Sequence, residues 1–102
     1  MNKSTLIKES IKTNNARVAE YSIPSNSRGR KHIHNNVFEE LYCLSGVLRV
    51  ELSGQADAEL NGGDKVFIPQ GTKHCITNVS DKDARFLVVQ GGGDFDLVAD
   101  EV

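Results

Sequence analysis

The sequence is poor in several features that mark particular protein classes. It has only two cysteines, Cys43 and Cys75, among 102 residues. Two cysteines in a chain without an export signal are expected to be reduced thiols, not a disulfide framework. The N-terminus lacks a long apolar run, so we expect neither a signal peptide nor a membrane span. A cytoplasmic location is therefore the default prediction.

The chain also lacks an excess of positive charge. Its 12 basic and 14 acidic residues are spread along the sequence and give a formal net charge of -2. Phosphate binding needs a concentrated basic surface, so nucleic acid is not an expected partner. A length of 102 residues has room for one domain, which we place at residues 1–102. Because a domain of this size buries a modest share of its surface, self-association would be an ordinary way to gain burial.

Short apolar runs separated by turn-forming residues indicate an all-β fold. Examples are Val47 to Leu52, Lys65 to Ile68 and Arg85 to Val89. Such spacing predicts an antiparallel sandwich or barrel. Asn61-Gly62 is a hairpin signal, because both residues tolerate positive φ. A helical period is absent from the middle of the chain, and at most the N-terminal twelve residues are expected to form a helical turn.

Alternation within these runs predicts which side chains face inward. In the run 47–52, the even-numbered residues are all apolar and the odd-numbered ones include both charges. We therefore expect Arg49 and Glu51 to face water and their even-numbered neighbours to face the core. The same logic places Phe67 on an outer face, where it suits a second sheet or a subunit contact.

The most informative residues are the histidines, of which the chain has three. His32 and His34 are two residues apart, which on a strand points both imidazoles to one face. Glu39 stands at the polar end of an inward-facing row, and His74 also begins an alternating stretch. Three imidazoles and one carboxylate suit Fe, Mn, Co, Ni, Cu or Zn. We predict that one divalent metal ion is held by His32, His34, Glu39 and His74.

Two segments have a distinctive spacing of histidine, glutamate, proline and glycine. The first reads His32-Ile33-His34, four residues, Glu39, six residues, Gly46, and the second reads Gly63, five residues, Pro69-Gln70-Gly71, two residues, His74, three residues, Asn78. They resemble the two motifs of the cupin family, G-x5-H-x-H-x3-4-E-x6-G and G-x5-P-x-G-x2-H-x3-N. One position differs, because Asn26 stands where the opening glycine would be. Asn adopts turn conformations nearly as well as Gly.

The resemblance implies an antiparallel double-stranded β-helix, or jelly-roll barrel, with the metal near one mouth. It covers a core of about residues 16–90, flanked by a short N-terminal arm and a C-terminal strand or tail. The spacing of six residues to Gly46 selects Glu39 as the ligand, and alternation turns the adjacent Glu40 outward. The implied assembly is a homodimer, which the outward Phe67 and the small size of the chain also favour.

The predicted interior beside the metal is small and mostly apolar. The alternation of inward and outward side chains along each strand places Leu41, Cys43, Val50 and Ile76 there as candidate substrate-binding residues. The alternative for Cys43 is a small buried apolar residue with no role in binding. Arg30 shares the phase of the histidines and is a candidate partner for a substrate carboxylate or phosphate. The alternative is that Arg28 and Arg30 belong to a solvated basic loop.

Two functions remain open on the sequence alone. The first is a metal-dependent enzyme acting on a small oxygen-bearing metabolite, of dioxygenase, isomerase, decarboxylase or lyase type. The second is a non-catalytic cupin module that binds or senses a small molecule. A free-standing regulator usually carries a DNA-binding domain, and the sequence has no helix-turn-helix pattern. This favours the enzyme over the binding module.

Overall fold

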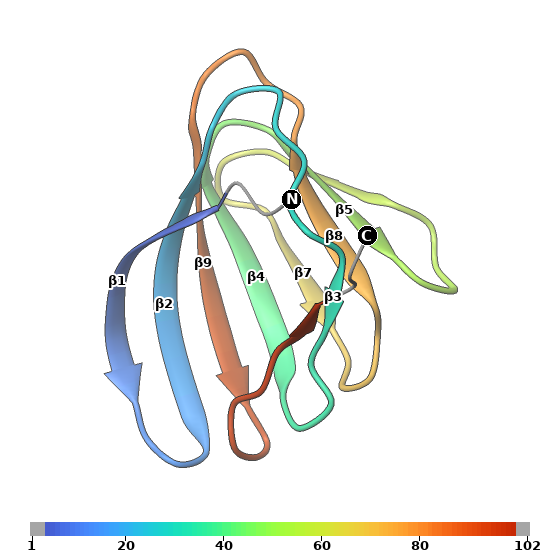
Figure 1. Cartoon of the computed structure of the whole chain (residues 1–102). Coiled ribbons are helices and arrows are strands. Elements are labelled where there is room, and N and C mark those ends of the chain that lie inside the picture. Colours follow the sequence, from blue (N-terminus) through green and yellow to red (C-terminus); the bar gives the residue numbers. More distant parts are fainter. Residues whose placement is uncertain (1–3, 100–102) are drawn as a thin grey trace.

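The computed structural model describes residues 4–99, which fold into two five-stranded antiparallel sheets (Figure 1). The first sheet contains, in spatial order, β1 (Thr5–Lys12), β2 (Ala16–Ile23), β9 (Ala84–Gly91), β4 (Phe38–Ser45) and β7 (Lys65–Ile68). The second contains β10 (Val98–Ala99), β3 (His32–Ile33), β8 (His74–Asn78), β5 (Leu48–Leu52) and β6 (Ala58–Leu60). The predicted all-β jelly-roll barrel is confirmed.

The core lies between the two sheets and follows the predicted alternation. Leu48 and Val50 are fully buried on β5, Leu52 is nearly so, and Arg49 between them is exposed. The first sheet contributes Leu41 and Cys43 of β4 to the same core, and both are buried. Phe67 on β7 is 50 % exposed, so its predicted outward direction is confirmed.

The N-terminal segment differs from the prediction of a helical turn. Residues Thr5–Lys12 form β1, an edge strand that pairs antiparallel with β2. All eight residues of β1 are exposed, so burial of side chains does not hold the strand in place. Pairing with β2 satisfies its backbone groups, and this tertiary contact overrides a weak local preference.

The Asn61-Gly62 signal marks a turn, but the turn does not close a hairpin. The N–H of Asp64 donates to the carbonyl of Asn61 at 2.9 Å, and Gly63 has φ 95°. The flanking strands β6 and β7 belong to different sheets, so the chain passes from the second sheet to the first at this turn. At the other motif position, Asn26 has φ 52°, a backbone conformation that Asn adopts more readily than most residues.

The C-terminal segment returns to the edge of the second sheet, beside β3. β10 pairs antiparallel with β3, matching Val98 to Ile33 and Ala99 to His32. The predicted C-terminal strand is therefore present up to residue 99, and the rest of the predicted tail lies outside the described residues. None of the described residues forms a helix long and apolar enough to cross a membrane.

Candidate metal centre

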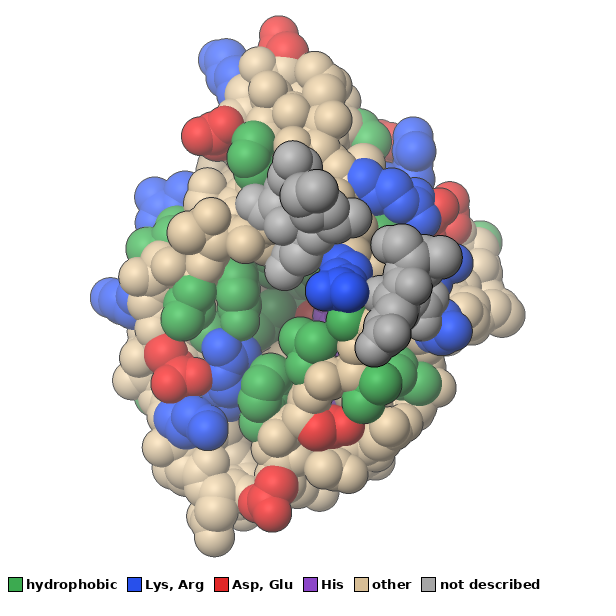
Figure 2. Space-filling model, viewed as in Figure 1, with side chains coloured by type: hydrophobic (Ala, Val, Ile, Leu, Met, Phe, Trp, Pro, Cys, Tyr) green, Lys and Arg blue, Asp and Glu red, His purple; other side chains and the backbone are tan. Residues whose placement is uncertain are grey.

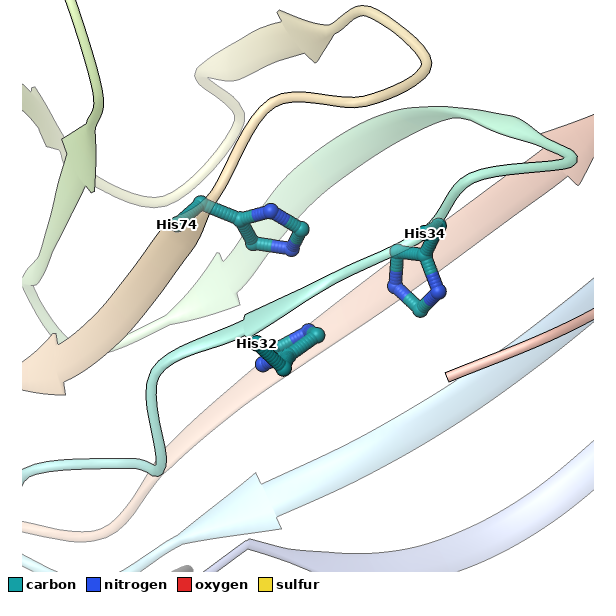
Figure 3. A group of neighbouring side chains, drawn as sticks. All are labelled: His32, His34 and His74. Atoms are coloured by element: carbon teal, nitrogen blue, oxygen red, sulfur yellow. The ribbon is translucent and has the colours of Figure 1, made fainter. Parts of the chain in front are cut away.

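The three histidines converge from two strands of the second sheet (Figure 3). His32 begins β3, His34 follows that strand, and His74 begins β8 directly opposite His32 in the register. A ligand atom of each imidazole lies within 4.8 Å of those of the other two. His34 and His74 are 4 % and 1 % exposed, so this group can hold a metal ion away from bulk water.

Each imidazole is anchored through its Nδ1 atom to a backbone carbonyl. Because a carbonyl oxygen only accepts, each Nδ1 must carry the proton. In the neutral form of each ring, Nε2 then carries the lone pair that can bind a metal ion, the usual arrangement around metal-binding histidines. The acceptors are the carbonyl of Arg30 for His32 at 2.9 Å, that of Asp96 for His34 at 2.5 Å and that of Thr72 for His74 at 2.9 Å.

The surroundings of one of these Nε2 atoms show whether the site suits a metal ion. Nε2 of His74 is buried and has no hydrogen-bond partner. A buried polar atom without a partner costs about 1–3 kcal/mol. A metal ion bound at the Nε2 atoms would satisfy it, and imidazole nitrogens suit several divalent transition metals. The residues present therefore fit the predicted ion.

The carboxylate predicted as the fourth ligand faces the same interior but contacts only part of the group. Glu39 is 2 % exposed, and its Oε1 lies 3.1 Å from Nε2 of His34. The same oxygen accepts a hydrogen bond from Nε2 of Gln90 at 2.8 Å. The adjacent Glu40 points outward and pairs with Lys65 at 2.9 Å, as its phase predicts. Metal ligation by Glu39 stays a prediction.

Burial and mutual contacts shift the pKa values of these groups in different directions. Burial and the neighbouring His74 lower the pKa of His32 to about 4. Burial also lowers the pKa of His74. Burial opposes protonation of His34, but the hydrogen bonds to Glu39 and to the Asp96 carbonyl outweigh it and raise the pKa of His34. Burial opposes ionisation of Glu39, but His34 and His74 outweigh it and lower the pKa of that carboxyl.

A cavity of about 140 Å³ opens beside the histidines. Figure 2 shows a hollow on this face, with hydrophobic side chains around it and basic side chains at its rim. The lining includes His32, His34 and Glu39 together with the polar residues Ser4, Tyr21, Arg30 and Gln90. The rest of the lining is apolar apart from Gly29, and consists of Ile76, Phe86, Val88, Phe95, Leu97 and Ala99. Such a space accommodates a small ligand beside the histidines.

The predicted substrate-binding residues fall into two groups. Ile76 and Arg30 line the cavity. Leu41, Cys43 and Val50 are buried in the hydrophobic core and are not among the cavity residues. For Cys43 this placement agrees with the alternative of a small buried apolar residue, and Leu41 and Val50 lie in the same core instead of lining the cavity as predicted. Alternation gives the inward face of a strand but not the position of a residue along the barrel.

The second arginine of the loop lies apart from the cavity. Arg28 pairs with Glu51 at 2.8 Å, and its side chain is 54 % exposed. The placement of Arg28 agrees with the alternative of a solvated basic loop.

Sequence reasoning missed a group of cavity residues from β2, β9 and the C-terminal segment. Tyr21, Gln90 and Phe95 all line the cavity, and Arg17 lies behind them at 6 % exposure. The available signal was the alternation in β2, which puts Arg17, Ala19 and Tyr21 on one face. A charged residue at an inward position goes unnoticed when charge is taken to mean exposure.

Solved structures with the same fold include both uncharacterised proteins and enzymes. A conserved protein with a double-stranded β-helix domain from Klebsiella pneumoniae has a TM-score of 0.81 at 18 % identity, covering 95 % of this chain and 85 % of its own. An oxalate oxidase in complex with glycolate has a TM-score of 0.83 at 20 % identity, covering 95 % of this chain and 55 % of its own. A variant of oxalate decarboxylase from Bacillus subtilis has a TM-score of 0.76 at 20 % identity, covering 84 % and 24 %.

These similarities establish the fold, and the chain spans only about half of the oxalate oxidase chain. No curated protein matches the chain significantly by sequence. The sequence pattern of the cupin domain matches residues 19–90, which is most of the chain. This match agrees with the two motifs that contain the histidines and with the jelly-roll sheets. The chain therefore belongs to the cupin family.

Proposed function

We propose that this cupin binds one divalent metal ion through His32, His34, His74 and Glu39 and acts as an enzyme on a small oxygen-bearing metabolite. The observation that carries the proposal is the convergence of three imidazoles whose Nδ1 atoms are all anchored to carbonyls. A histidine cluster with a purely structural role would be expected to use both nitrogens in hydrogen bonds, yet Nε2 of His74 has no partner. Iron, manganese, nickel, zinc and cobalt all suit this set of ligands.

A divalent metal ion in this site would supply a Lewis acid that polarises an oxygen atom of the ligand. The residues of the chain supply binding and orientation. Apolar side chains such as Ile76, Val88 and Phe95 line the cavity and exclude water, which strengthens polar contacts made inside it. Two polar residues of the cavity lining, Tyr21 and Arg30, are proposed to bind oxygen atoms of a ligand.

Tyr21 is the more specific of the two. Its hydroxyl oxygen accepts a hydrogen bond from Nη2 of Arg17 at 2.8 Å, which leaves the hydroxyl proton for another acceptor. Its ring is held by stacking on Phe86 with the centroids 5.4 Å apart. The phenol is therefore fixed in place as a donor to a ligand oxygen.

The first experiment is the metal content of protein purified without a polyhistidine tag, beside His32→Ala and His74→Ala. We expect about one equivalent of a transition metal in the unchanged chain and loss of it in both variants. The proposal would be refuted if both variants kept the metal content of the unchanged chain, or if the unchanged chain took up no metal after reconstitution. The matched control is Glu40→Gln at the adjacent outward residue, and this variant should retain the metal.

Catalysis is tested separately, with small hydroxy and dicarboxylic acids as first candidates. Glycolate and oxalate are suitable probes, because the structurally similar oxalate oxidase was solved with glycolate. Turnover of such an acid that depends on the metal would support the enzyme. Tight binding without turnover would favour the alternative, a module that binds or senses a small molecule.

We also propose that the chain forms a homodimer. Phe67 is 50 % exposed and packs against Phe38 on the outer face of the first sheet, with ring centroids 5.8 Å apart. Sedimentation should give twice the chain mass for the unchanged protein. A monomeric unchanged protein would refute the dimer, and Phe67→Ser should weaken it if this face takes part.

A further inference from the structure

Arg17 is a buried arginine that lies behind the cavity and makes three side-chain hydrogen bonds at once. Its Nε donates to Glu9 at 2.5 Å, its Nη1 to Gln90 at 3.0 Å and its Nη2 to Tyr21 at 2.8 Å. The guanidinium also lies 4.5 Å from the centre of the Phe95 ring. A buried guanidinium needs one carboxylate partner, and Glu9 already provides it. The other two hydrogen bonds, to Gln90 and Tyr21, both go to residues that line the cavity.

The contact with Gln90 fixes the direction of an amide. A guanidinium has donors only, so the group facing Arg17 must be the carbonyl oxygen of Gln90. The NH2 group then points the other way, and Nε2 of Gln90 donates to Oε1 of Glu39 at 2.8 Å. If the amide turned over, two donors would face each other at Arg17, and an oxygen would face the carboxylate of Glu39. Arg17 therefore selects the orientation in which Gln90 holds Glu39.

The strands make this chain of contacts rigid. Arg17 pairs with Gln90 in the register of β2 and β9, and Gln90 pairs with Glu39 in the register of β9 and β4. All three side chains are at most 6 % exposed. They point to one face of the sheet because adjacent strands share the pleat at paired positions.

We propose that Arg17 is a positioning residue for the metal centre, which acts through Gln90 to hold the Glu39 carboxylate toward the histidines. This inference rests on the proposed function, in which Glu39 is a metal ligand. Outer contacts of this kind fix the orientation of a ligand, and removing one typically lowers metal affinity by about 10–100-fold.

The test is a titration of metal-free protein with Co²⁺, with the cobalt absorption spectrum as a record of ligand geometry. We expect Gln90→Leu and Arg17→Met each to weaken Co²⁺ binding by about 10–100-fold and to change the spectrum. Because both act through one contact, the double variant should bind Co²⁺ no more weakly than Gln90→Leu alone. Losses that multiply in the double variant would overturn the proposal.

Two further variants separate positioning from charge and from general stability. Arg17→Lys keeps the charge, but one ammonium cannot replace a fork that contacts Glu9 and Gln90 together, so it should also weaken Co²⁺ binding. Arg85→Met is the control, since Arg85 lies on β9 and pairs with Glu20 on the outer face of the sheet. It should bind Co²⁺ within about twofold of the unchanged chain.

A measurement on the metal-free protein separates this inference from the proposed function. The side-chain NH2 resonances of Gln90 should shift and exchange faster in Arg17→Lys, because the amide is no longer fixed. Unchanged resonances would overturn the positioning role whether or not the chain takes up metal. Metal uptake by the unchanged chain tests only the proposed function, and equal Co²⁺ affinity in all variants would overturn only the inference about Arg17.

Discussion

The backbone carbonyl of Asp96 accepts a hydrogen bond from Nδ1 of His34 at 2.5 Å, across 62 residues of sequence. The side chain of Asp96 strengthens the same junction. Its two carboxylate oxygens accept hydrogen bonds from the backbone N–H groups of Asn35 at 2.9 Å and Asn36 at 3.0 Å. The C-terminal segment thus fixes the tautomer of one predicted ligand while Phe95 and Leu97, on either side of Asp96, line the cavity.

We expect Asp96→Ala to loosen this junction. Loss of two charge-assisted hydrogen bonds at an exposed site should lower the free energy of unfolding by about 1–2 kcal/mol. Metal affinity should fall severalfold, because His34 loses a fixed orientation. Urea unfolding and Co²⁺ titration measure the two effects. Asp94→Ala removes an exposed carboxylate of the same segment and should change neither quantity.

Two buried polar residues at the ends of β8 should respond very differently to leucine. Asn78 is fully buried, and its Nδ2 donates to the carbonyls of Ile23, Pro24 and Lys82 while its Oδ1 accepts from Ser80. Asn78→Leu leaves these groups unpaired and should cost about 3 kcal/mol or more.

His74→Leu should have a small effect on the stability of the metal-free protein, within about 1 kcal/mol. It removes the hydrogen bond to Thr72, but it also removes the buried Nε2 that has no partner. The same change should abolish metal binding. Denaturant unfolding in the presence of a chelator checks the stability, and a large loss for His74→Leu would contradict the assignment of an unsatisfied atom.

The motif glycines should differ in how well they tolerate alanine. Gly46 has φ 84°, and a Cβ there would lie 2.7 Å from the Cβ of Ala84. Gly63 has φ 95°, but a Cβ there would meet nothing within 4 Å. Gly46→Ala should therefore cost about 3 kcal/mol and Gly63→Ala about 1–2 kcal/mol. Thermal and urea unfolding would show equal losses if backbone strain alone decided the cost.

The stability of the metal-free protein should depend on the protonation of His32. The pKa of His32 is lowered from 6.5 to about 4, chiefly by burial. Its stabilising contribution is therefore complete above pH 6.5 and is lost as the pH falls toward about 4, because the unfolded chain binds the proton more readily. Urea midpoints at pH 7.0, 5.5 and 4.5, taken with a chelator, should fall less for His32→Gln than for the unchanged chain. Parallel falls in both proteins would contradict this contribution.

The sequence by itself determined the fold class and the residue types of the candidate metal centre. Turn formers at short intervals and a side-chain period of two follow from local backbone geometry, so they are visible without tertiary contacts. The same period separated Glu39 from Glu40 and predicted an outward Phe67. Motif spacing identified all three histidines that the structure brings together.

Only the tertiary structure decided which inward side chains reach the cavity and which fill the core. Leu41, Cys43 and Val50 share the inward phase but are part of the core, whereas Ile76 lines the cavity. The register between β2, β9 and β4 aligns Arg17, Gln90 and Glu39, although they are far apart in sequence. Phase is a local property of a strand, but depth along the barrel depends on how distant strands pair, and no single strand contains that information.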